Sequence, residues 1–285
     1  MSAAVTKGLR VFEGATAVIT GGASGIGKAL AGDLATRGCE VVLADRQVEL
    51  GEAAAAAIRE AGGKATAAEM DVTDFAGVQA LMQETLARTG RLDFVFNNAG
   101  IGVGGPLERL GVDDWNLTID VNLRGVANGV QAAYPMMVEQ GFGHIVNTAS
   151  VAGLVSMVEG VPYATTKHAV VGLTTSLRAE AASKGVRASV LCPGIVRTPI
   201  LEKGGRFGKN VGDATTEQER EFYEKRRPIS AEEFARRSLD GVAKNRAIIV
   251  VPSSWRLGWW LNRLSPSLGI YLARKDHESV LKSRS

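Results

Sequence analysis

Short runs rich in β-branched and apolar residues alternate with longer helix-forming segments along most of this chain. Such alternation favours parallel strands joined by right-handed crossovers, with helices on both faces of the sheet. The expected strands are residues 15–20, 40–44, 64–70, 92–96, 144–148, 186–191 and 247–251. The expected helices are residues 25–37, 48–61, 74–89, 112–139, 163–183 and 231–244. The pattern predicts an α/β, doubly wound parallel sheet of the Rossmann-like class, as a single domain with a C-terminal helical extension.

Composition and charge exclude several other classes of protein. The 285 residues are 45% hydrophobic and 22% charged, which is too apolar for a disordered chain. The net charge of +3 is too small to predict nucleic-acid binding. Cys39 and Cys192 are the only cysteines, so we expect neither a disulfide framework nor a zinc site. No secretion signal or membrane span is evident, and we therefore expect a cytoplasmic protein without a metal.

A glycine-rich loop, Thr20-Gly21-Gly22-Ala23-Ser24-Gly25-Ile26-Gly27, closes the first expected strand and opens the first expected helix. Glycine permits a tight turn and lets backbone amides approach a pyrophosphate, which the positive helix N-terminus stabilises. Glycine also serves ordinary turns, but the strand–turn–helix context favours a dinucleotide site. The expected cofactor contacts in this loop are Gly21, Ser24, Gly25, Ile26 and Gly27.

Asp45 ends the second expected strand, 18 residues after Gly27. A carboxylate at this place can accept hydrogen bonds from the ribose hydroxyls and would repel a 2′-phosphate, so it favours NAD over NADP. The adjacent Arg46 could instead pair with a 2′-phosphate. We expect both residues at the cofactor, with NAD preferred. The alternative for Asp45 is a simple helix cap.

Tyr163 and Lys167 lie four residues apart on one face of an expected helix. A tyrosine titrates near pH 10 in water, too high for proton transfer at neutral pH, and a nearby cation favours its phenolate form. Ser150, 13 residues upstream at the end of a strand, can donate a hydrogen bond to a substrate oxygen. The combination with the glycine loop predicts hydride transfer at a hydroxyl or carbonyl group.

With these residues in place, the chain resembles the short-chain dehydrogenase/reductase family, in its compact one-domain branch. The resemblance extends from about Gly14 to Pro199. The matching positions are Thr20 to Gly27, Asp71-Val72, Asn97-Asn98-Ala99-Gly100, Asn122, Ser150, Tyr163, Lys167, Pro193-Gly194 and Thr198.

The resemblance implies a role for each of these positions. Tyr163 would be the general acid or base, Ser150 would polarise the carbonyl, and Lys167 would lower the tyrosine pKa and hold the nicotinamide ribose. Asn122 would hold a water that links Lys167 to solvent. The remaining implied cofactor contacts are Asp71, Val72, Asn98, Ala99, Gly100, Pro193, Gly194, Ile195 and Thr198. The resemblance also implies a homodimer or homotetramer.

Two segments break the regular alternation. Residues 198–228, rich in glycine and charge, are expected to form a mobile lid on the catalytic domain, residues 1–252, with a variable surface loop as the alternative. In the extension, residues 253–285, Trp255, Trp259 and Trp260 alternate with Arg256 and Arg263, and the charge from residue 254 onward is +4. Packing on the body or across a subunit boundary is favoured; contact with a membrane surface is the alternative.

The residues expected near the substrate are mostly apolar, with ordinary core packing as the alternative for each. They are Ile101, Val103, Ala152, Leu154, Met157, Val158, Ile200 and Leu201. The predicted substrate is therefore a hydrophobic secondary alcohol or ketone. The alternatives are an NADP-dependent carbonyl reductase, a non-catalytic nucleotide sensor and a sugar-nucleotide epimerase. Retention of all four polar site residues argues against the sensor.

Overall fold

The computed structural model describes residues 8–201 and 208–284. Seven strands form one parallel sheet in the order β11-β7-β6-β4-β1-β2-β3. The strands are β1 (Thr16–Thr20), β2 (Glu40–Asp45), β3 (Lys64–Glu69), β4 (Phe94–Asn97), β6 (Gly143–Thr148), β7 (Val186–Pro193) and β11 (Ile248–Val251). The strand order reverses direction at β1, whose neighbours are β2 and β4. The predicted doubly wound fold is confirmed.

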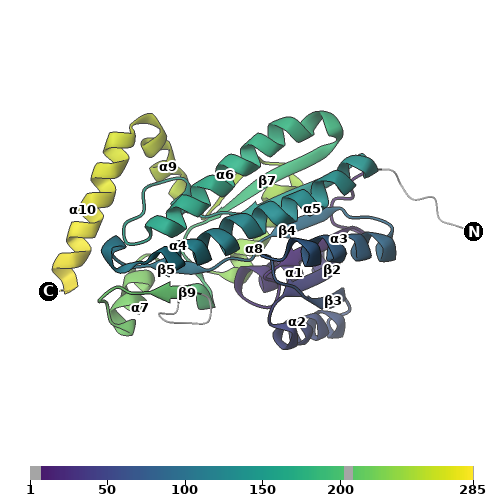
Figure 1. The fold of residues 1–285 in the computed structure, drawn as a ribbon, viewed down its shortest axis with the longest axis horizontal. Coiled ribbons are helices and arrows are strands. Elements are labelled where there is room, and N and C mark those ends of the chain that lie inside the picture. Colours follow the sequence, from purple (N-terminus) through teal and green to yellow (C-terminus); the bar gives the residue numbers. More distant parts are fainter. Residues whose placement is uncertain (1–7, 202–207, 285) are drawn as a thin grey trace, which may run out of the picture.

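Helices cover both faces of this sheet (Figure 1). They are α1 (Gly25–Thr36), α2 (Val48–Glu60), α3 (Phe75–Thr89), α4 (Val112–Ile119), α5 (Gly125–Gln140), α6 (Val161–Ala181), α7 (Thr216–Lys225), α8 (Ala231–Ala243), α9 (Trp255–Leu264) and α10 (Pro266–Arg284). One apolar core joins the sheet to α1, α2 and α8, and a second joins it to α3, α5 and α6. Because the strands are covered on both faces, β1, β4 and β6 are buried at every position.

The structure departs from the predicted elements where a segment is short or irregular. A π-helical turn, η2 (Asp120–Arg124), interrupts the expected helix 112–139 and separates α4 from α5. Four short strands, absent from the expected set, form two small parallel pairs outside the main sheet. They are β5 (Gly102–Gly104), β8 (Val196–Arg197), β9 (Gly208–Asn210) and β10 (Ile229–Ser230). Strands of two or three residues are too short to produce a recognisable period.

A few 3₁₀ turns complete the chain. They are η1 (Leu107–Arg109), η3 (Val151–Gly153), η4 (Ala182–Lys184) and η5 (Pro199–Leu201). The segment 198–228 therefore contains η5, β9 and α7 rather than a structureless loop, although residues 202–207 of the expected lid lie outside the described residues.

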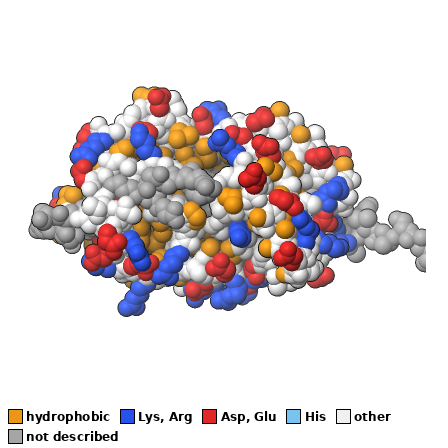
Figure 2. Space-filling view, turned by 90° about the horizontal axis from the view of Figure 1, so that it is seen from below, with side chains coloured by type: hydrophobic (Ala, Val, Ile, Leu, Met, Phe, Trp, Pro, Cys, Tyr) orange, Lys and Arg blue, Asp and Glu red, His pale blue; other side chains and the backbone are white. Residues whose placement is uncertain are grey.

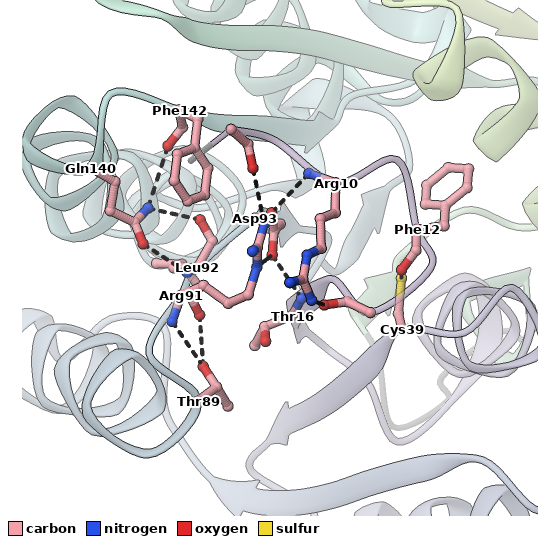
Figure 3. Close-up of polar contacts among 12 residues, drawn as sticks. Arg10, Phe12, Thr16, Cys39, Thr89, Arg91, Leu92, Asp93, Gln140 and Phe142 are labelled. Carbon is pink, nitrogen blue, oxygen red and sulfur yellow. Dashed lines mark hydrogen bonds and ion pairs between the residues drawn. The ribbon is translucent and has the colours of Figure 1, made fainter. Parts of the chain in front are cut away.

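A buried ion pair holds the amino-terminal edge of the sheet, opposite the edge where the strands end (Figure 3). Arg91 Nε donates to Asp93 Oδ2 at 2.6 Å, and the two side chains are 6% and 0% exposed. The Asp93 carboxylate also accepts backbone N–H groups of Thr16, at 2.9 Å, and Arg10, at 3.2 Å. One carboxylate thus joins the start of β4 to the start of β1 and to the N-terminal segment.

His144 of β6 is a second buried titratable group, 1% exposed. Its Nε2 lies 2.8 Å from Ser189 Oγ, while the Ser189 hydroxyl donates to the carbonyl of Arg246 at 2.7 Å. Because a hydroxyl has only one hydrogen to donate, His144 Nε2 carries the proton of a neutral ring. Burial, together with the charges of Arg187 and Arg178, lowers the pKa of His144 to about 3.

This histidine predicts a loss of stability in acid. The unfolded chain takes up a proton below its ordinary pKa of 6.5, whereas the folded protein does not until about pH 3. Stability therefore falls through this window as pH falls, and we expect His144 to account for about 2–3 kcal/mol of the loss by pH 4.5. Urea unfolding at pH 7 and 4.5 measures this loss of stability.

A His144→Asn variant should lose less stability between these pH values than the wild type does. The exposed control His168→Asn should lose as much as the wild type. Equal losses in all three proteins would contradict the assignment to His144.

Candidate active site

The carboxyl ends of the main strands border one cavity of about 1170 Å³. It lies where the strand order reverses, between β1 and β4, the place at which doubly wound sheets bind ligands. On the face seen in Figure 2, apolar side chains show between scattered acidic and basic ones. Ser150, Tyr163 and Lys167 line the cavity, together with every predicted cofactor residue except Gly27. The structure therefore brings predicted site residues from between positions 21 and 198 of the chain to one cavity.

The glycine loop is shaped by close contact with the end of β4. Thr20 Oγ1 accepts the backbone N–H groups of Asn98 and Ala99 at 2.9 and 3.0 Å. Gly21 has a φ of +65°, and a Cβ there would lie 2.9 Å from the Ala99 Cα. A Cβ on Gly27 would lie 2.0 Å from the Gly21 carbonyl oxygen. Gly27 thus has a packing role behind the loop, while the front of the loop faces the cavity and can admit a pyrophosphate.

The Asp45 carboxylate is fixed at the end of β2 by backbone amides. It accepts from Ala23 N at 3.1 Å and from Gln47 N at 3.0 Å, which links it to the glycine loop. The neighbouring Arg46 is 72% exposed and lies 3.5 Å from the Asp71 carboxylate. The pKa of Asp71 is lowered: burial alone would raise it, but hydrogen bonds from Thr73 and the Arg46 charge outweigh burial. Both predicted adenosine-side acids border the cavity.

Lys167 places a buried ammonium group beside the end of β6. Its Nζ donates to the Thr148 carbonyl at 3.0 Å and lies 5.5 Å from the centre of the Tyr163 ring. The side chain is almost wholly buried, and burial lowers the pKa of Lys167 to about 8. The position of Gly100 leaves room for it, since a Cβ there would lie 3.4 Å from Nζ.

Ser150 lies beside Tyr163 in the cavity lining, where its hydroxyl is placed to donate a hydrogen bond to the phenolate. Ser150 also accepts the backbone N–H of Ala152 at 3.1 Å, which orients its hydroxyl at the start of η3. The predicted lowering of the tyrosine pKa is not found in the protein alone. Burial raises the pKa of Tyr163, and the Ser150 hydrogen bond, which favours the phenolate, only reduces the rise. The prediction considered the lysine charge and omitted the loss of water around the phenol.

A chain of buried amides, which sequence reasoning did not find, anchors α6 to the sheet behind the site. Asn97 Nδ2 donates to Asn147 Oδ1 at 2.8 Å, and Asn147 Nδ2 donates to Thr174 Oγ1 at 2.9 Å. Gly129 of α5 makes room, because a Cβ there would lie 1.8 Å from Asn97 Oδ1. Since α6 also carries Tyr163, these contacts help to set the position of the phenol.

Asn122 lies in the π-helical turn η2 and is wholly buried. Its Nδ2 donates to the Ile101 carbonyl at 2.9 Å, and its Oδ1 accepts the Ile101 N–H at 2.8 Å. It is the one predicted catalytic residue that does not line the cavity. The amide therefore holds the segment after β4 in place, and the water relay stays a prediction.

Segments far apart in the chain meet at the other end of the cavity. Thr198 approaches the glycine loop, since a Cβ on Gly25 would lie 3.3 Å from the Thr198 Cβ. A Cβ on Gly194 would lie 2.4 Å from Trp255 Nε1, so the extension packs directly against the predicted nicotinamide loop. A side chain at either glycine would push these segments apart.

Most predicted substrate residues border the cavity, with one exception. Ile101, Val103, Ala152, Met157, Val158, Ile200 and Leu201 line it. Leu154 does not: it belongs to an apolar core, where its carbonyl accepts a hydrogen bond from Asn262. Lining residues that the sequence did not indicate come from α7, α9 and α10, and they are Phe222, Tyr223, Arg226, Trp255, Leu261, Asn262, Leu272, Asp276 and His277. Their spacing carried no signal, because they belong to helices that meet only in the folded chain.

Two other functions were tested on the described residues. Within residues 8–201 and 208–284, no group of three or more histidine, cysteine, aspartate or glutamate side chains could hold a metal ion. In that part of the chain, no helix is both long enough and apolar enough to cross a bilayer.

A Rossmann-like sheet with a glycine cradle and a serine, tyrosine and lysine at one cavity defines a dinucleotide-dependent oxidoreductase. Residues 15–206 match the family model described as short chain dehydrogenase. The chain belongs to the short-chain dehydrogenase/reductase family, whose fold binds NAD(P), and it is an enzyme acting on an alcohol or ketone.

Similar proteins support this assignment. An uncharacterised oxidoreductase of Listeria innocua is 39% identical over 203 residues, 70% of this chain and 79% of the relative. The levodione reductase of Leifsonia aquatica is 40% identical over 194 residues, 67% of this chain and 73% of the relative. A short-chain dehydrogenase/reductase from Burkholderia phymatum, solved with NAD, has a TM-score of 0.82 and 34% identity, covering 91% of this chain and 96% of its own.

Proposed function

We propose that this enzyme transfers a hydride between NAD(H) and a hydrophobic secondary alcohol or ketone, using Ser150, Tyr163 and Lys167. The observation that carries the proposal is the grouping of Ser150, Tyr163 and the buried Lys167 in the same cavity as the glycine loop. A bound nicotinamide would supply or accept the hydride. The phosphates of the dinucleotide would lie at residues 21–26, and its nicotinamide ribose near Lys167.

The side chains supply the proton that accompanies the hydride. In reduction, the Tyr163 phenol gives its proton to the substrate oxygen; in oxidation, the phenolate takes the hydroxyl proton. The Ser150 hydroxyl donates to the same oxygen and stabilises the charge that develops on it. Lys167 favours the phenolate that proton donation leaves behind. Asn122 and the Asn97–Asn147–Thr174 chain act as positioning residues, because they hold the segments that carry the reacting groups.

The lining of the cavity supports an apolar substrate. The apolar lining residues include Val103, Met157, Ile200 and Phe222. An apolar wall favours substrates that lose little hydration on binding. We expect a panel of lipophilic secondary alcohols and ketones, followed at the nicotinamide absorbance in both directions, to contain the preferred substrates. Turnover confined to sugars or small hydroxy acids would contradict the proposed substrate class.

The Asp45 carboxylate supports NAD as the cofactor. Its two backbone contacts fix it at the end of β2, and Arg46 already has Asp71 as a partner. A solved relative from Beutenbergia cavernae, a putative NAD(P)-dependent gluconate 5-dehydrogenase with 29% identity, holds NADP at low occupancy, so family membership alone does not select the cofactor.

We expect the wild type to bind NADH at least tenfold more tightly than NADPH, measured by fluorescence titration. Asp45→Ser should reduce this ratio by about tenfold or more, because it removes both the ribose acceptor and the repulsion of a 2′-phosphate. Glu69→Gln, one strand away in register with Asp45 but outside the cavity, is the matched control. A wild type that prefers NADPH would favour the alternative, an NADP-dependent carbonyl reductase that uses Arg46.

The remaining predictions concern the setting of the enzyme. We propose a cytoplasmic location, which the two buried free cysteines support. A homodimer or homotetramer stays the prediction from the family resemblance, and light scattering on the purified protein measures it.

A further inference from the structure

The two C-terminal helices form a hairpin at one end of the molecule (Figure 1). Its inner face is held to the body by contacts of several kinds. Trp255 and Trp259 pack against an apolar core, and Asn262 Nδ2 donates to the Leu154 carbonyl at 3.1 Å. Asp276 of α10 pairs with Arg226, the residue that follows α7, at 2.9 Å. The packing predicted for the tryptophans therefore accounts for one side of the hairpin.

The outer side of the hairpin is unusually apolar for a surface. Of the twenty large hydrophobic side chains that are exposed among the described residues, nine lie between Leu257 and Leu281. On α9 these include Leu257, Trp260 and Leu264, which are 68, 49 and 79% exposed. At 100° per residue the three fall on one side of the helix. Neighbouring exposed residues on α10 are Leu268, Ile270, Tyr271 and Leu272. A gathering of exposed apolar side chains on one helix side, as on α9, marks an interaction site.

Exposed arginines border this apolar side. Arg256 and Arg263 are seven residues apart, two helical turns, so they share one flank of α9 next to Leu257 and Leu264. The acidic residues described on the hairpin have other partners: Asp276 pairs with Arg226, and Glu278 pairs with Arg274 and Lys275. Neither Arg256 nor Arg263 forms an ion pair with a described residue, so this flank of α9 carries positive charge.

We propose that the outer side of the α9–α10 hairpin docks on the surface of an anionic lipid bilayer. Tryptophan and leucine side chains beside arginine hold a helix in the headgroup region of a bilayer. The apolar side of the helix enters the lipid, and the arginines contact the anionic headgroups. A second copy of this chain is a poorer occupant. A two-fold contact would bring the same arginine flank of both copies together, and like charges at an interface oppose association.

The cavity borders the outer side of the α9–α10 hairpin, so a bilayer contact there would serve the active site. Leu261 and Leu272 line the cavity and are also 36 and 46% exposed. A lipophilic substrate dissolved in the bilayer would thus reach the active site past the hairpin without crossing water. This use of the contact rests on the proposed function, whereas bilayer binding itself does not.

Co-sedimentation of the full chain with vesicles, without substrate or cofactor, tests the proposal. Vesicles of phosphatidylcholine with phosphatidylglycerol should pellet the wild type at low ionic strength, and phosphatidylcholine alone should pellet much less. Arg256→Glu with Arg263→Glu should weaken binding by about tenfold or more, since each basic residue near a charged surface contributes to affinity. Leu257→Glu with Leu264→Glu should weaken binding to a similar extent. The matched control, Arg236→Glu with Arg237→Glu on exposed positions of α8, should bind as the wild type does.

Three outcomes would overturn the proposal. The first is a wild type that stays in the supernatant with anionic vesicles, and the second is binding that neither α9 double variant reduces. The third is a dimer, seen by light scattering, that Leu257→Glu with Leu264→Glu dissociates while the wild type binds no vesicles; a second copy would then cover this side. Because no turnover is measured, each of these outcomes leaves the proposed reaction untouched.

Discussion

Replacing Tyr163 by phenylalanine is expected to lower kcat by about 10²–10⁴-fold, the usual contribution of a positioned general acid or base. The change removes one oxygen atom, the one that accepts the Ser150 hydrogen bond and would exchange a proton with the substrate. Cofactor affinity should change little, because the glycine loop and Asp45 are untouched. Steady-state kinetics in both directions, together with NADH titration, measure the two effects.

Tyr134→Phe is the matched control for this variant. Tyr134 lies on α5, and its hydroxyl is 3.5 Å from Glu180, outside the cavity lining. We expect its kcat to stay within about twofold of the wild type, since it removes a hydroxyl far from the reacting atoms. A Tyr163→Phe enzyme as active as this control would assign proton transfer to another group.

Replacing Asp93 by asparagine is expected to lower the free energy of unfolding by about 3–5 kcal/mol, the cost of breaking a buried ion pair. The variant keeps the shape of the side chain but leaves the Arg91 guanidinium charged and buried without its anion (Figure 3). No other group offsets this loss, because the Arg91 Nη1 is already buried without a hydrogen-bond partner among the described residues. Urea unfolding at neutral pH measures the loss. NADH affinity should be unchanged in the folded protein, since Asp93 lies at the edge opposite the cavity.

Two further variants separate the ion pair from the loss of a charge in general. Asp120→Asn breaks an exposed ion pair, in which Asp120 is 45% and Arg124 62% exposed. It should lower the free energy of unfolding by less than about 1 kcal/mol. Arg91→Met combined with Asp93→Asn removes the buried cation as well and should be more stable than Asp93→Asn alone. An Asp93→Asn protein as stable as Asp120→Asn would show that the buried pair contributes little.

The predictable parts of this site depend on spacing within one segment. The order of glycines 21, 25 and 27 at the end of a strand defines the cradle, because a turn and a helix N-terminus are local structures. Tyr163 and Lys167 share a helix face through four-residue spacing. The seven main strands were predictable from short runs of β-branched and apolar residues, and the parallel pairing followed from the helices between them.

Other features depend on contacts between distant segments. Asn122 was recognisable by resemblance, yet only the fold shows that its amide is paired with Ile101, 21 residues away. The sequence places Leu154 among the substrate residues, with ordinary core packing as the alternative, and the structure puts it in an apolar core. No local period distinguishes these cases.

Taken by itself, the sequence determined the class of sheet, and it predicted the dinucleotide cradle and the residues proposed to move a proton. These follow from strand and helix periods and from side-chain chemistry at short range. Only the tertiary structure decided how burial changes the pKa of Tyr163 and Lys167, because desolvation depends on every segment packed around a group. It also decided that the C-terminal helices have one side on the cavity and an apolar, basic side toward solvent, since the body they pack against is assembled from the rest of the chain.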